Sequence, residues 1–344
     1  MKILVTPTSM QPENESNALN KLRDFSQELA SNSWELASNS LELASNSLEL
    51  ASNSLELVFN SLNRPLTEEE LIPLLKDCDG FIAGIDFITA KVIASCPKLK
   101  VISRYGAGYD RVDIQAAKEA GIAVTNTPGV NAQAVGELTF GLILSLARRI
   151  PYLNQQTRQG AWVRSIGMEL KGKTLGILGL GAIGKVVARC GQGVGMHIIT
   201  YDPFVNREYC KEHRIEICSA EEVIKRGQVI SLHLPLNHET QNYINKERIK
   251  QMLDGVIVIN TSRGGLVNEE DAYKALKSGK LGGLGLDAFA LEPPKVSPLF
   301  ALDNVVVTPH TGAHTYEATE QMGELAVKNL IQVLTGKECP YVVN

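Results

Sequence analysis

No stretch of the 344-residue sequence reaches the roughly 18 consecutive apolar residues that a membrane-spanning helix needs. The N-terminal apolar run, residues 1–5, is too short for a signal peptide and is typical of a first β-strand. The formal net charge is only −4, and no basic stripe of the kind needed for nucleic-acid binding is present. We therefore expect a cytoplasmic protein that binds neither a membrane nor a nucleic acid.

The six cysteines support neither a disulfide framework nor a metal site, because they lack C-x-x-C spacing and clustered histidines. We therefore expect no metal. The sequence does have the 44% hydrophobic content that is ordinary for a globular enzyme. Its 344 residues exceed the size at which a single core usually keeps growing, so we expect two domains.

Residues 28–62 repeat with a period of seven, and we interpret the fifth copy, residues 56–62, as the original unit, which contains a strand. Removing residues 28–55 would join Gln27 to Glu56, so we interpret this segment as an in-frame expansion. The apolar positions of the repeat also fit a coiled coil. Because each copy contains Ser-Asn-Ser, which is unfavourable inside a helix, we expect a marginal surface helix or a mobile loop instead.

Short apolar runs alternate with helical patterns along the rest of the chain. This alternation predicts the α/β class, with two doubly wound parallel-sheet domains and a cleft between them. We expect one long helix from about Ala132 to Asn154, with Leu138, Leu142, Leu146 and Ile150 on its apolar face. A last helix, residues 316–335, should return to the first domain. The expected strands are residues 2–5, 57–60, 80–83, 100–103, 122–126, 174–178, 197–201, 229–234, 256–260, 283–288 and 305–308.

A glycine fingerprint lies between the apolar run 174–178 and a helical pattern that starts at Lys185. In this strand–turn–helix context, Gly179 would allow a tight turn, Gly181 would let the backbone approach a pyrophosphate, and Gly184 would let helix and strand pack closely. The phosphates would then bind at the helix N-terminus. The sequence therefore predicts a dinucleotide-binding site.

Asp202 follows the next apolar run, eighteen residues after Gly184. A carboxylate at this position can accept hydrogen bonds from the adenosine ribose hydroxyls, and it would repel the additional phosphate of NADP. Pro203 and Phe204 come next, so no arginine stands beside Asp202 to bind that phosphate. We therefore predict NAD rather than NADP as the cofactor.

Three later strand ends lead to Arg263, Glu292 and His310. Because ligands bind at the carboxyl ends of parallel strands, these side chains are expected in one site. We assign His310 as the general acid/base, Glu292 as the carboxylate that orients its ring, and Arg263 as the clamp for a carboxylate or keto oxygen. The other histidines, of which His233 and His314 lie nearest to strand ends, are expected to be structural.

With these residues in view, the chain resembles the D-isomer-specific 2-hydroxyacid dehydrogenases, and within them the phosphoglycerate dehydrogenase branch in a short form without a C-terminal regulatory domain. The resemblance covers nearly everything outside residues 28–55. It rests on Gly179-x-Gly181-x-x-Gly184, Tyr201-Asp202-Pro203, His233-Leu234-Pro235-Leu236, Asn260 to Gly265, Gly285-Leu286-Asp287, Glu292-Pro293-Pro294 and Pro309 to Ala313.

The resemblance implies hydride transfer between NAD and a D-2-hydroxy acid. The first choice of substrate is 3-phosphoglycerate, and reduction of hydroxypyruvate or glyoxylate is the alternative. The alternative outside enzymes is an NAD(H)-sensing corepressor-like binding protein. It implies a flavodoxin-like substrate domain (1–128 and 317–344), a Rossmann NAD-binding domain (129–316), and a homodimer built by the helix after Asn131. It also implies that Ala182, Ile183, Pro235, Thr261, Arg263 and Asp287 contact the dinucleotide. Arg104, Tyr105, Gly106, Ala107 and Arg148 are expected to contact substrate, with Arg104, Arg148 and Arg149 as candidates for holding a phosphate.

Overall fold

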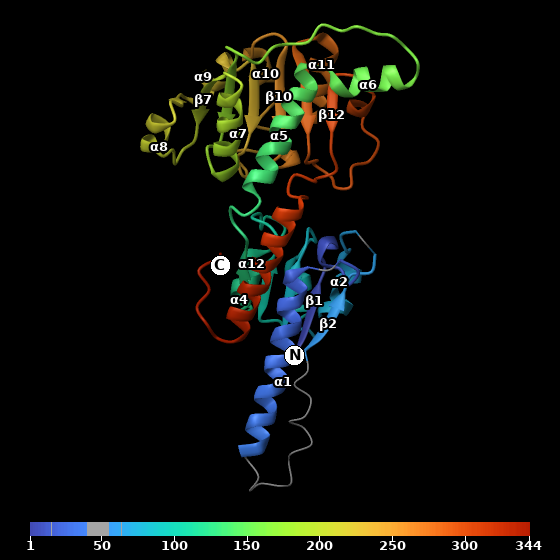
Figure 1. Cartoon of the computed structure of the whole chain (residues 1–344), viewed down its shortest axis with the longest axis vertical. Coiled ribbons are helices and arrows are strands. Elements are labelled where there is room, and N and C mark those ends of the chain that lie inside the picture. The colour runs from blue at the N-terminus through green and yellow to red at the C-terminus, as the bar shows by residue number, and fades with distance from the viewer. Residues whose placement is uncertain (15, 40–54, 63) are drawn as a thin grey trace. The chain divides into compact units, whose positions relative to one another are not determined.

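The computed structural model describes residues 1–14, 16–39, 55–62 and 64–344. The chain divides into two compact units, one formed by residues 1–131 and 315–344 and the other by residues 132–314. Each unit is built on a parallel β-sheet with helices on both faces (Figure 1). The prediction of an α/β chain with two parallel-sheet domains is confirmed.

The sheet of the first unit has five parallel strands in the order β2-β1-β3-β4-β5. This is the flavodoxin-like order of doubly wound sheets. Its side chains at the strand centres are almost all buried, as expected for strands covered on both faces. The strands are β1 (Lys2–Val5), β2 (Glu56–Phe59), β3 (Gly80–Ala83), β4 (Val101–Arg104) and β5 (Ala123–Thr125).

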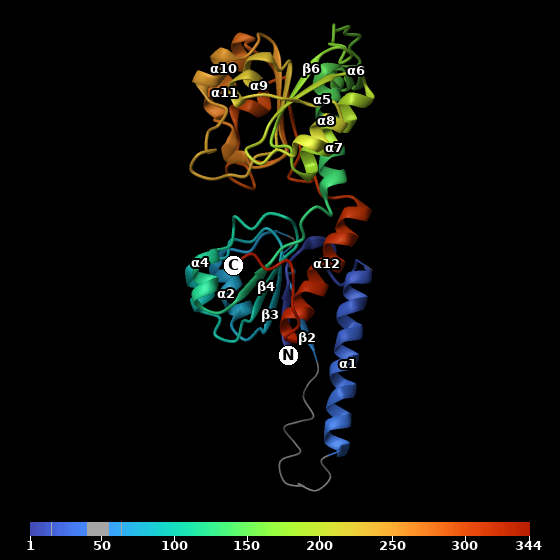
Figure 2. The ribbon, with the colours of Figure 1, turned by 90° about the vertical axis from the view of Figure 1, so that its left-hand side faces the viewer.

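Two long helices, α1 (Asn17–Asn39) and α12 (Tyr316–Leu334), pack together on one face of this sheet (Figure 2). The shorter helices α2 (Glu68–Leu75), α3 (Ala90–Ala94) and α4 (Ile114–Glu119) cover the other face. The C-terminal helix α12 therefore belongs to the first unit, although more than 180 residues separate it from β5 in the sequence.

The repeat begins within α1 and ends in β2. Among the side chains of α1 that the structure describes, the buried apolar ones are Ala18, Leu19, Leu22 and Phe25, all of which precede the repeat. Residues 28–39 continue α1 as a helix, and the fifth copy forms β2. Residues 40–54, on which most of the expectation of a surface helix or loop depends, lie outside the described residues.

The sheet of the second unit has seven parallel strands in the order β12-β11-β10-β9-β6-β7-β8. This is the Rossmann order, extended by one strand at one edge. The two-residue strand β8 was not predicted from the sequence. The strands are β6 (Thr174–Leu178), β7 (His197–Tyr201), β8 (Glu216–Ile217), β9 (Val229–Leu232), β10 (Val256–Asn260), β11 (Leu281–Leu286) and β12 (Val305–Val307).

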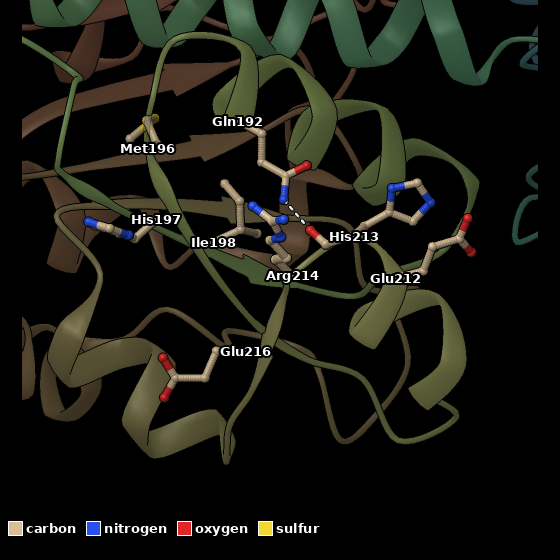
Figure 3. A pocket seen from close by; sticks show the side chains of 8 residues that line it. All are labelled: Gln192, Met196, His197, Ile198, Glu212, His213, Arg214 and Glu216. Atoms are coloured by element: carbon tan, nitrogen blue, oxygen red, sulfur yellow. Dashed lines mark hydrogen bonds between the residues drawn. The ribbon is translucent and has the colours of Figure 1, made fainter.

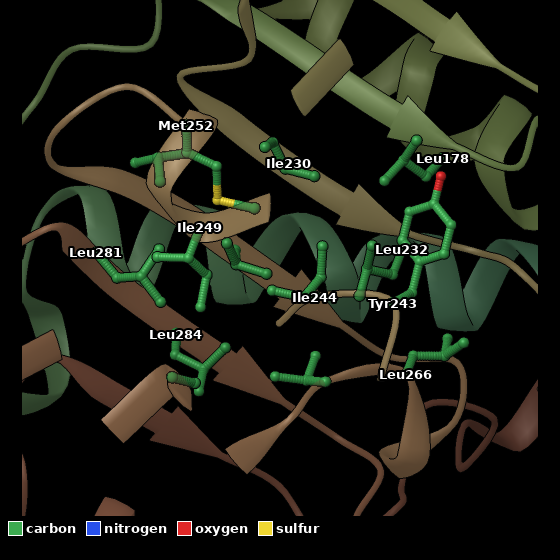
Figure 4. Packing of buried hydrophobic residues seen from close by; sticks show 14 of the residues in the cluster. Leu178, Ile230, Leu232, Tyr243, Ile244, Ile249, Met252, Leu266, Leu281 and Leu284 are labelled. Atoms are coloured by element: carbon green, nitrogen blue, oxygen red, sulfur yellow. The ribbon is translucent and has the colours of Figure 1, made fainter. Parts of the chain in front are cut away.

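Helices on the two faces of this sheet enclose two separate apolar clusters. The cluster drawn in Figure 4 packs strand residues such as Ile230 and Leu284 against Ile249 and Met252 at α10. The opposite cluster packs α5 and α7 against the sheet. The helices are α5 (Ala132–Ala147), α6 (Ile150–Arg158), α7 (Ala182–Gly193), α8 (Arg207–Glu212), α9 (Ala220–Arg226), α10 (Lys246–Gln251) and α11 (Glu269–Ser278).

The expectation of one helix from about Ala132 to Asn154 was wrong, because α5 ends at Ala147 and α6 begins at Ile150. Pro151 has no N–H to donate, and its ring would collide with the carbonyl of Ala147 in a continuous helix. Arg149 makes the break with a backbone φ of +53°. Ile150, predicted on the buried face, is consequently 52% exposed.

No helix among the described residues is long and apolar enough to span a membrane. Nor does the described part of the chain hold a group of three His, Cys, Asp or Glu side chains arranged to bind a metal ion.

Candidate active site

The glycine turn lies after β6, where the strand order of the second sheet reverses between β6 and β9. Gly179 has a φ of +98°, and a Cβ there would lie 2.5 Å from the carbonyl oxygen of His233. A Cβ on Gly184 would lie 2.2 Å from the carbonyl oxygen of Gly179. A Cβ on Gly181 would contact nothing within 4 Å. Two of the glycines are thus required by the fold itself, whereas the third leaves open space at the N-terminus of α7, as pyrophosphate binding requires.

Asp202 follows β7 and reaches back to this turn. Its Oδ2 accepts a hydrogen bond of 2.7 Å from the N–H of Leu180, and its Oδ1 accepts one of 2.8 Å from the N–H of Phe204. Both bonds hold the carboxylate next to the glycine turn while leaving further lone pairs to accept ribose hydroxyls. The residues therefore fit a dinucleotide whose adenosine lies on the β7 side of the turn.

His310 and Glu292 lie in contact at the same edge of this sheet, after the strands β12 and β11. The Nδ1 atom of His310 lies 2.9 Å from both carboxylate oxygens of Glu292. Because a carboxylate only accepts, Nδ1 carries the proton in this pair and Nε2 is the nitrogen available for chemistry. The Glu292 side chain is 8% exposed and that of His310 is 32% exposed, so the acceptor is buried and the imidazole is accessible. The N–H of Phe289 donates to Glu292 Oε1 and fixes the carboxylate further.

Asp287, at the end of β11, holds the loop that carries His310. Its Oδ1 accepts hydrogen bonds from Thr308 Oγ1 (2.6 Å) and the N–H of Thr311 (2.8 Å), and its Oδ2 accepts one from the N–H of Gly312 (2.8 Å). His310 itself has a φ of +53°, a left-handed conformation uncommon for a non-glycine residue. Asp287 therefore restrains a loop whose conformation is otherwise unfavourable, in addition to the cofactor contact that the family resemblance implies.

Arg263 is brought close to the Glu292 loop by the glycine that follows it. A Cβ on Gly264 would lie 1.8 Å from the carbonyl carbon of Phe289, so only glycine allows the two strand-end segments to touch. The guanidinium of Arg263 is half-buried and donates to the carbonyl of Ser262 over 2.8 Å. Arg263, Glu292 and His310 thus come from the carboxyl ends of the neighbouring strands β10, β11 and β12.

Two other histidines lie at this edge, and both are poor acid/base candidates at neutral pH. Burial lowers the pKa of His233 to about 4. Its Nε2 lies 2.9 Å from Ser231 Oγ, and its Nδ1 is buried with no partner among the described residues. Burial, assisted by the nearby His310, also lowers the pKa of His314. Both side chains are held neutral by burial, so neither is a good proton donor at neutral pH.

The remaining predicted dinucleotide contacts lie along the same edge. Ala182 is exposed and Ile183 half-buried at the start of α7, and Pro235 is exposed after β9. Thr261, after β10, is 7% exposed. The structure therefore brings the predicted cofactor residues of the second unit to the edge of the sheet where its parallel strands end.

In the first unit, the loop after β4 has the geometry of an anion cradle. Gly106 adopts a φ of +140° and donates its N–H to Thr127 Oγ1. Among the described residues, the N–H groups of Ala107 and Gly108 have no hydrogen-bond acceptor. Two such donors on consecutive residues suit a carboxylate.

The side chains predicted to bind substrate beside this loop are already committed to other partners. Arg104 is 5% exposed, and its guanidinium donates to the carbonyls of Gly108 and Ala83. The Tyr105 hydroxyl donates to the carbonyl of Thr319 and accepts from Ser9 Oγ, and burial raises the pKa of Tyr105 to about 12. Both side chains shape the cradle.

Arg148 and Arg149 do not reach the edge that carries His310. Arg149 lines a hollow of about 350 Å³ with Gly282 and Asn304, which lie at the amino ends of β11 and β12. His310 follows the carboxyl end of β12. Within this unit the two arginines therefore lie at the opposite edge of the sheet, away from the acid/base.

A second hollow, of about 470 Å³, also lies away from the site (Figure 3). His197 and Glu216 line it at the amino ends of β7 and β8, whereas Asp202 follows the carboxyl end of β7. Its lining mixes basic, acidic, polar and apolar side chains, and Glu216 is already paired with Arg226 at 2.7 Å. This mixed lining indicates no particular ligand.

Three contacts at the site were not predicted from the sequence. Thr139 on α5 lies 2.7 Å from Thr261, Phe289 donates its N–H to Glu292, and Thr308 donates to Asp287. Only Thr308 had a signal, since it ends the last strand directly before Pro309-His310. Thr139 lies 122 positions from Thr261, and no local pattern connects the two.

Comparison with known proteins identifies the relatives of this chain. The family model described as D-isomer specific 2-hydroxyacid dehydrogenase, NAD binding domain, matches residues 140–312. The chain is 42% identical over 283 residues to D-3-phosphoglycerate dehydrogenase of Methanocaldococcus jannaschii, covering 81% of this chain and 54% of that protein. It is 38% identical over 288 residues to glyoxylate reductase of Korarchaeum cryptofilum, covering 81% of this chain and 87% of that protein.

Among solved structures, the TT0316 protein from Thermus thermophilus matches with a TM-score of 0.83 at 35% identity, and the match covers the whole of both chains. The chain spans about half the length of the Methanocaldococcus relative and most of the Korarchaeum relative. The matched family domain and the glycine turn agree on NAD as the cofactor.

Proposed function

Because the chain belongs to the D-isomer-specific 2-hydroxyacid dehydrogenases, we propose that it interconverts a D-2-hydroxy acid and its 2-keto acid with NAD. The observation that carries this proposal is the contact between His310 Nδ1 and Glu292 at 2.9 Å, on the sheet that also carries the glycine turn. When bound, the nicotinamide supplies or accepts the hydride.

In this proposal His310 Nε2 handles the proton of the substrate oxygen. During reduction the imidazolium donates a proton from Nε2 to the oxygen that becomes the hydroxyl, and during oxidation neutral Nε2 accepts it. Glu292 keeps the other proton on Nδ1 and stabilises the imidazolium by its charge. Arg263, half-buried at the end of β10, is proposed to donate to the keto oxygen or the carboxylate.

The cradle after β4 is proposed to bind the substrate carboxylate. The N–H groups of Ala107 and Gly108, which have no acceptor within the described part of the chain, support this role, and Arg104 and Tyr105 then act by holding the loop. Asp202 is proposed to select NAD over NADP, because its carboxylate lies beside the glycine turn, where the extra phosphate of NADP would be repelled. The Asp202→Ala variant should therefore lose much of its preference for NADH over NADPH.

For the substrate itself we propose 3-phosphoglycerate and its keto acid, which would place the enzyme in serine biosynthesis. The 42% identity to a phosphoglycerate dehydrogenase supports this choice. The second candidate is reduction of glyoxylate or hydroxypyruvate, supported by relatives of similar identity that bear those names. The surroundings of Arg104 favour this second candidate, because its guanidinium is buried and bonded to two backbone carbonyls rather than exposed to hold a phosphate.

The deciding experiment measures NADH oxidation with phosphohydroxypyruvate, hydroxypyruvate, glyoxylate and pyruvate, with NADPH as the control cofactor. A kcat/KM highest for the phosphorylated keto acid supports phosphoglycerate dehydrogenase. A kcat/KM highest for glyoxylate or hydroxypyruvate supports the second candidate. NADH binding without oxidation of any of the four would contradict enzymatic activity and favour a dinucleotide sensor.

We also propose that the chain forms a homodimer through α5, α6 and the segment that follows them. Large apolar side chains are exposed there: Ile150 is 52% exposed, Trp162 83% and Ile166 97%. Apolar groups exposed to this degree on neighbouring elements are typical of an interface. Light scattering should give a dimer, and the Trp162→Ser/Ile166→Ser variant should shift it towards the monomer.

A further inference from the structure

A pair of threonines links helix α5 to the end of β10. Thr139 is fully buried, and Thr261 is 7% exposed. Their hydroxyl oxygens lie 2.7 Å apart, and Thr139 Oγ1 also lies 2.7 Å from the carbonyl oxygen of Val135, one turn earlier in the helix. The Thr139 hydroxyl is therefore in contact with two oxygen atoms.

The number of protons fixes the direction of both hydrogen bonds. Each hydroxyl has one proton, and a carbonyl oxygen can only accept. If Thr139 donated to Thr261, its 2.7 Å contact with the Val135 carbonyl would contain no proton. Both contacts are satisfied only when Thr139 donates to Val135 and Thr261 donates to Thr139. The Thr261 hydroxyl then presents lone pairs alone to its remaining surroundings.

The sheet topology places Thr261 on the path of the dinucleotide. From the glycine turn after β6, the strand order runs through β9 and β10 to β11 and β12, where Asp287 and His310 lie. Ser262, beside Thr261, donates to the carbonyl of Leu234 after β9 over 2.8 Å, so these strand ends are tied together. A cofactor with its pyrophosphate at Gly181 and its reactive ring near His310 must pass the end of β10.

We propose that Thr139 is a positioning residue that fixes the Thr261 hydroxyl as an acceptor facing the nicotinamide, and so favours the oxidised cofactor over the reduced one. The inference rests on the proposed function. The oxidised ring carries a positive charge, which oxygen lone pairs attract, whereas the reduced ring is neutral. A donor at the same position would repel the oxidised ring.

The test compares Thr139→Val, Thr139→Ser and Thr200→Val. Valine keeps the shape of threonine but removes the acceptor. The Thr261 hydroxyl then has no partner on α5 and can rotate so that its proton points to the cofactor site. Serine keeps the hydroxyl and hence the direction of both hydrogen bonds. Thr200 is equally buried and donates only to the carbonyl of Ile177, so Thr200→Val controls for the loss of a buried hydroxyl.

The readout is the ratio of the Kd for NAD to the Kd for NADH, with NADH titrated by its fluorescence and NAD by competition. Thr139→Val should raise this ratio about fivefold, the effect of one ordinary hydrogen bond, while the other two variants keep the wild-type ratio. An unchanged ratio in Thr139→Val, or an equal rise in Thr139→Ser, would overturn the proposal. If the wild type binds neither form, the proposed function fails, and the inference fails with it.

Discussion

The Nδ1 atom of His310 lies 2.9 Å from both carboxylate oxygens of Glu292, and this carboxylate is itself held by the N–H of Phe289. The pair leaves Nε2 as the only ring nitrogen for proton transfer. Since burial keeps His233 and His314 neutral, His310 is the histidine at this edge of the sheet that fits the proposed acid/base role.

Replacing His310 by alanine should lower kcat by about 10²–10⁴-fold, because general acid/base catalysis typically contributes that much. The Kd for NADH should stay near the wild-type value, since the glycine turn and Asp202 remain intact. His238→Ala is a suitable control, because that side chain is 90% exposed. Turnover by His310→Ala within a few-fold of the wild type would contradict the assignment.

Replacing Glu292 by glutamine keeps an acceptor for Nδ1 but removes the charge that stabilises the imidazolium. A hydrogen bond to a charged group contributes roughly 1.5–3 kcal/mol, so kcat for reduction should fall about 10- to 100-fold. Stopped-flow measurement of NADH oxidation would separate this loss from product release. Glu270→Gln, on the helix α11, serves as a control because that side chain is 77% exposed, and a loss of similar size in that variant would refute the specific role of Glu292.

The glycine turn allows binding and folding effects to be separated. Gly181→Ala should leave the melting temperature unchanged, because its Cβ contacts nothing, yet weaken NADH binding at the pyrophosphate position. Gly184→Ala should lower the melting temperature, since its Cβ would lie 2.2 Å from the carbonyl oxygen of Gly179. Gly193→Ala, in open space at the far end of α7, should do neither. Equal NADH affinity in Gly181→Ala and the wild type would argue against pyrophosphate binding at this turn.

His233 should make stability depend on pH. Its pKa of about 4 lies below the ordinary 6.5, so between these values the unfolded chain binds a proton that the folded chain does not. The free energy of unfolding should therefore fall as pH drops from 6.5 to 4, by about 3 kcal/mol at most. Urea unfolding at several pH values would measure this slope. His233→Gln should flatten it and His197→Gln should not, whereas an identical slope in His233→Gln would exclude His233 as the cause.

Deleting residues 28–55 should leave a folded chain. Ala18, Leu19, Leu22 and Phe25, the described buried apolar residues of α1, and the copy that forms β2 are all retained. Thermal unfolding of the shortened chain should match that of the full chain, and its circular dichroism should lose only the signal of the helical residues 28–39. NADH binding should persist, because the glycine turn lies in the other unit. An insoluble or unfolded product would show that the repeat contributes to the first unit.

The sequence predicted the features that depend on local patterns. Apolar runs located most strands, and the rule that ligands bind at strand ends singled out Glu292 and His310 before their contact was visible. The break at Arg149 was missed although Pro151 signals it, because the apolar pattern continues on both sides of the proline. The burial of Arg104 could not be predicted, because its hydrogen-bond partners, the carbonyls of Ala83 and Gly108, are placed by strand pairing and loop shape. The Thr139–Thr261 pair depends on a helix and a strand that meet only in the fold.

Hydride transfer itself can be followed with NADH that carries deuterium at the transferred position of its nicotinamide ring. With the best keto acid of the panel, we predict a D-configured 2-hydroxy acid with deuterium on the carbon next to the carboxylate. The wild type should form it, and His310→Ala should form it at least about a hundredfold more slowly. An L-configured product, or a product without deuterium on that carbon, would contradict the proposed reaction.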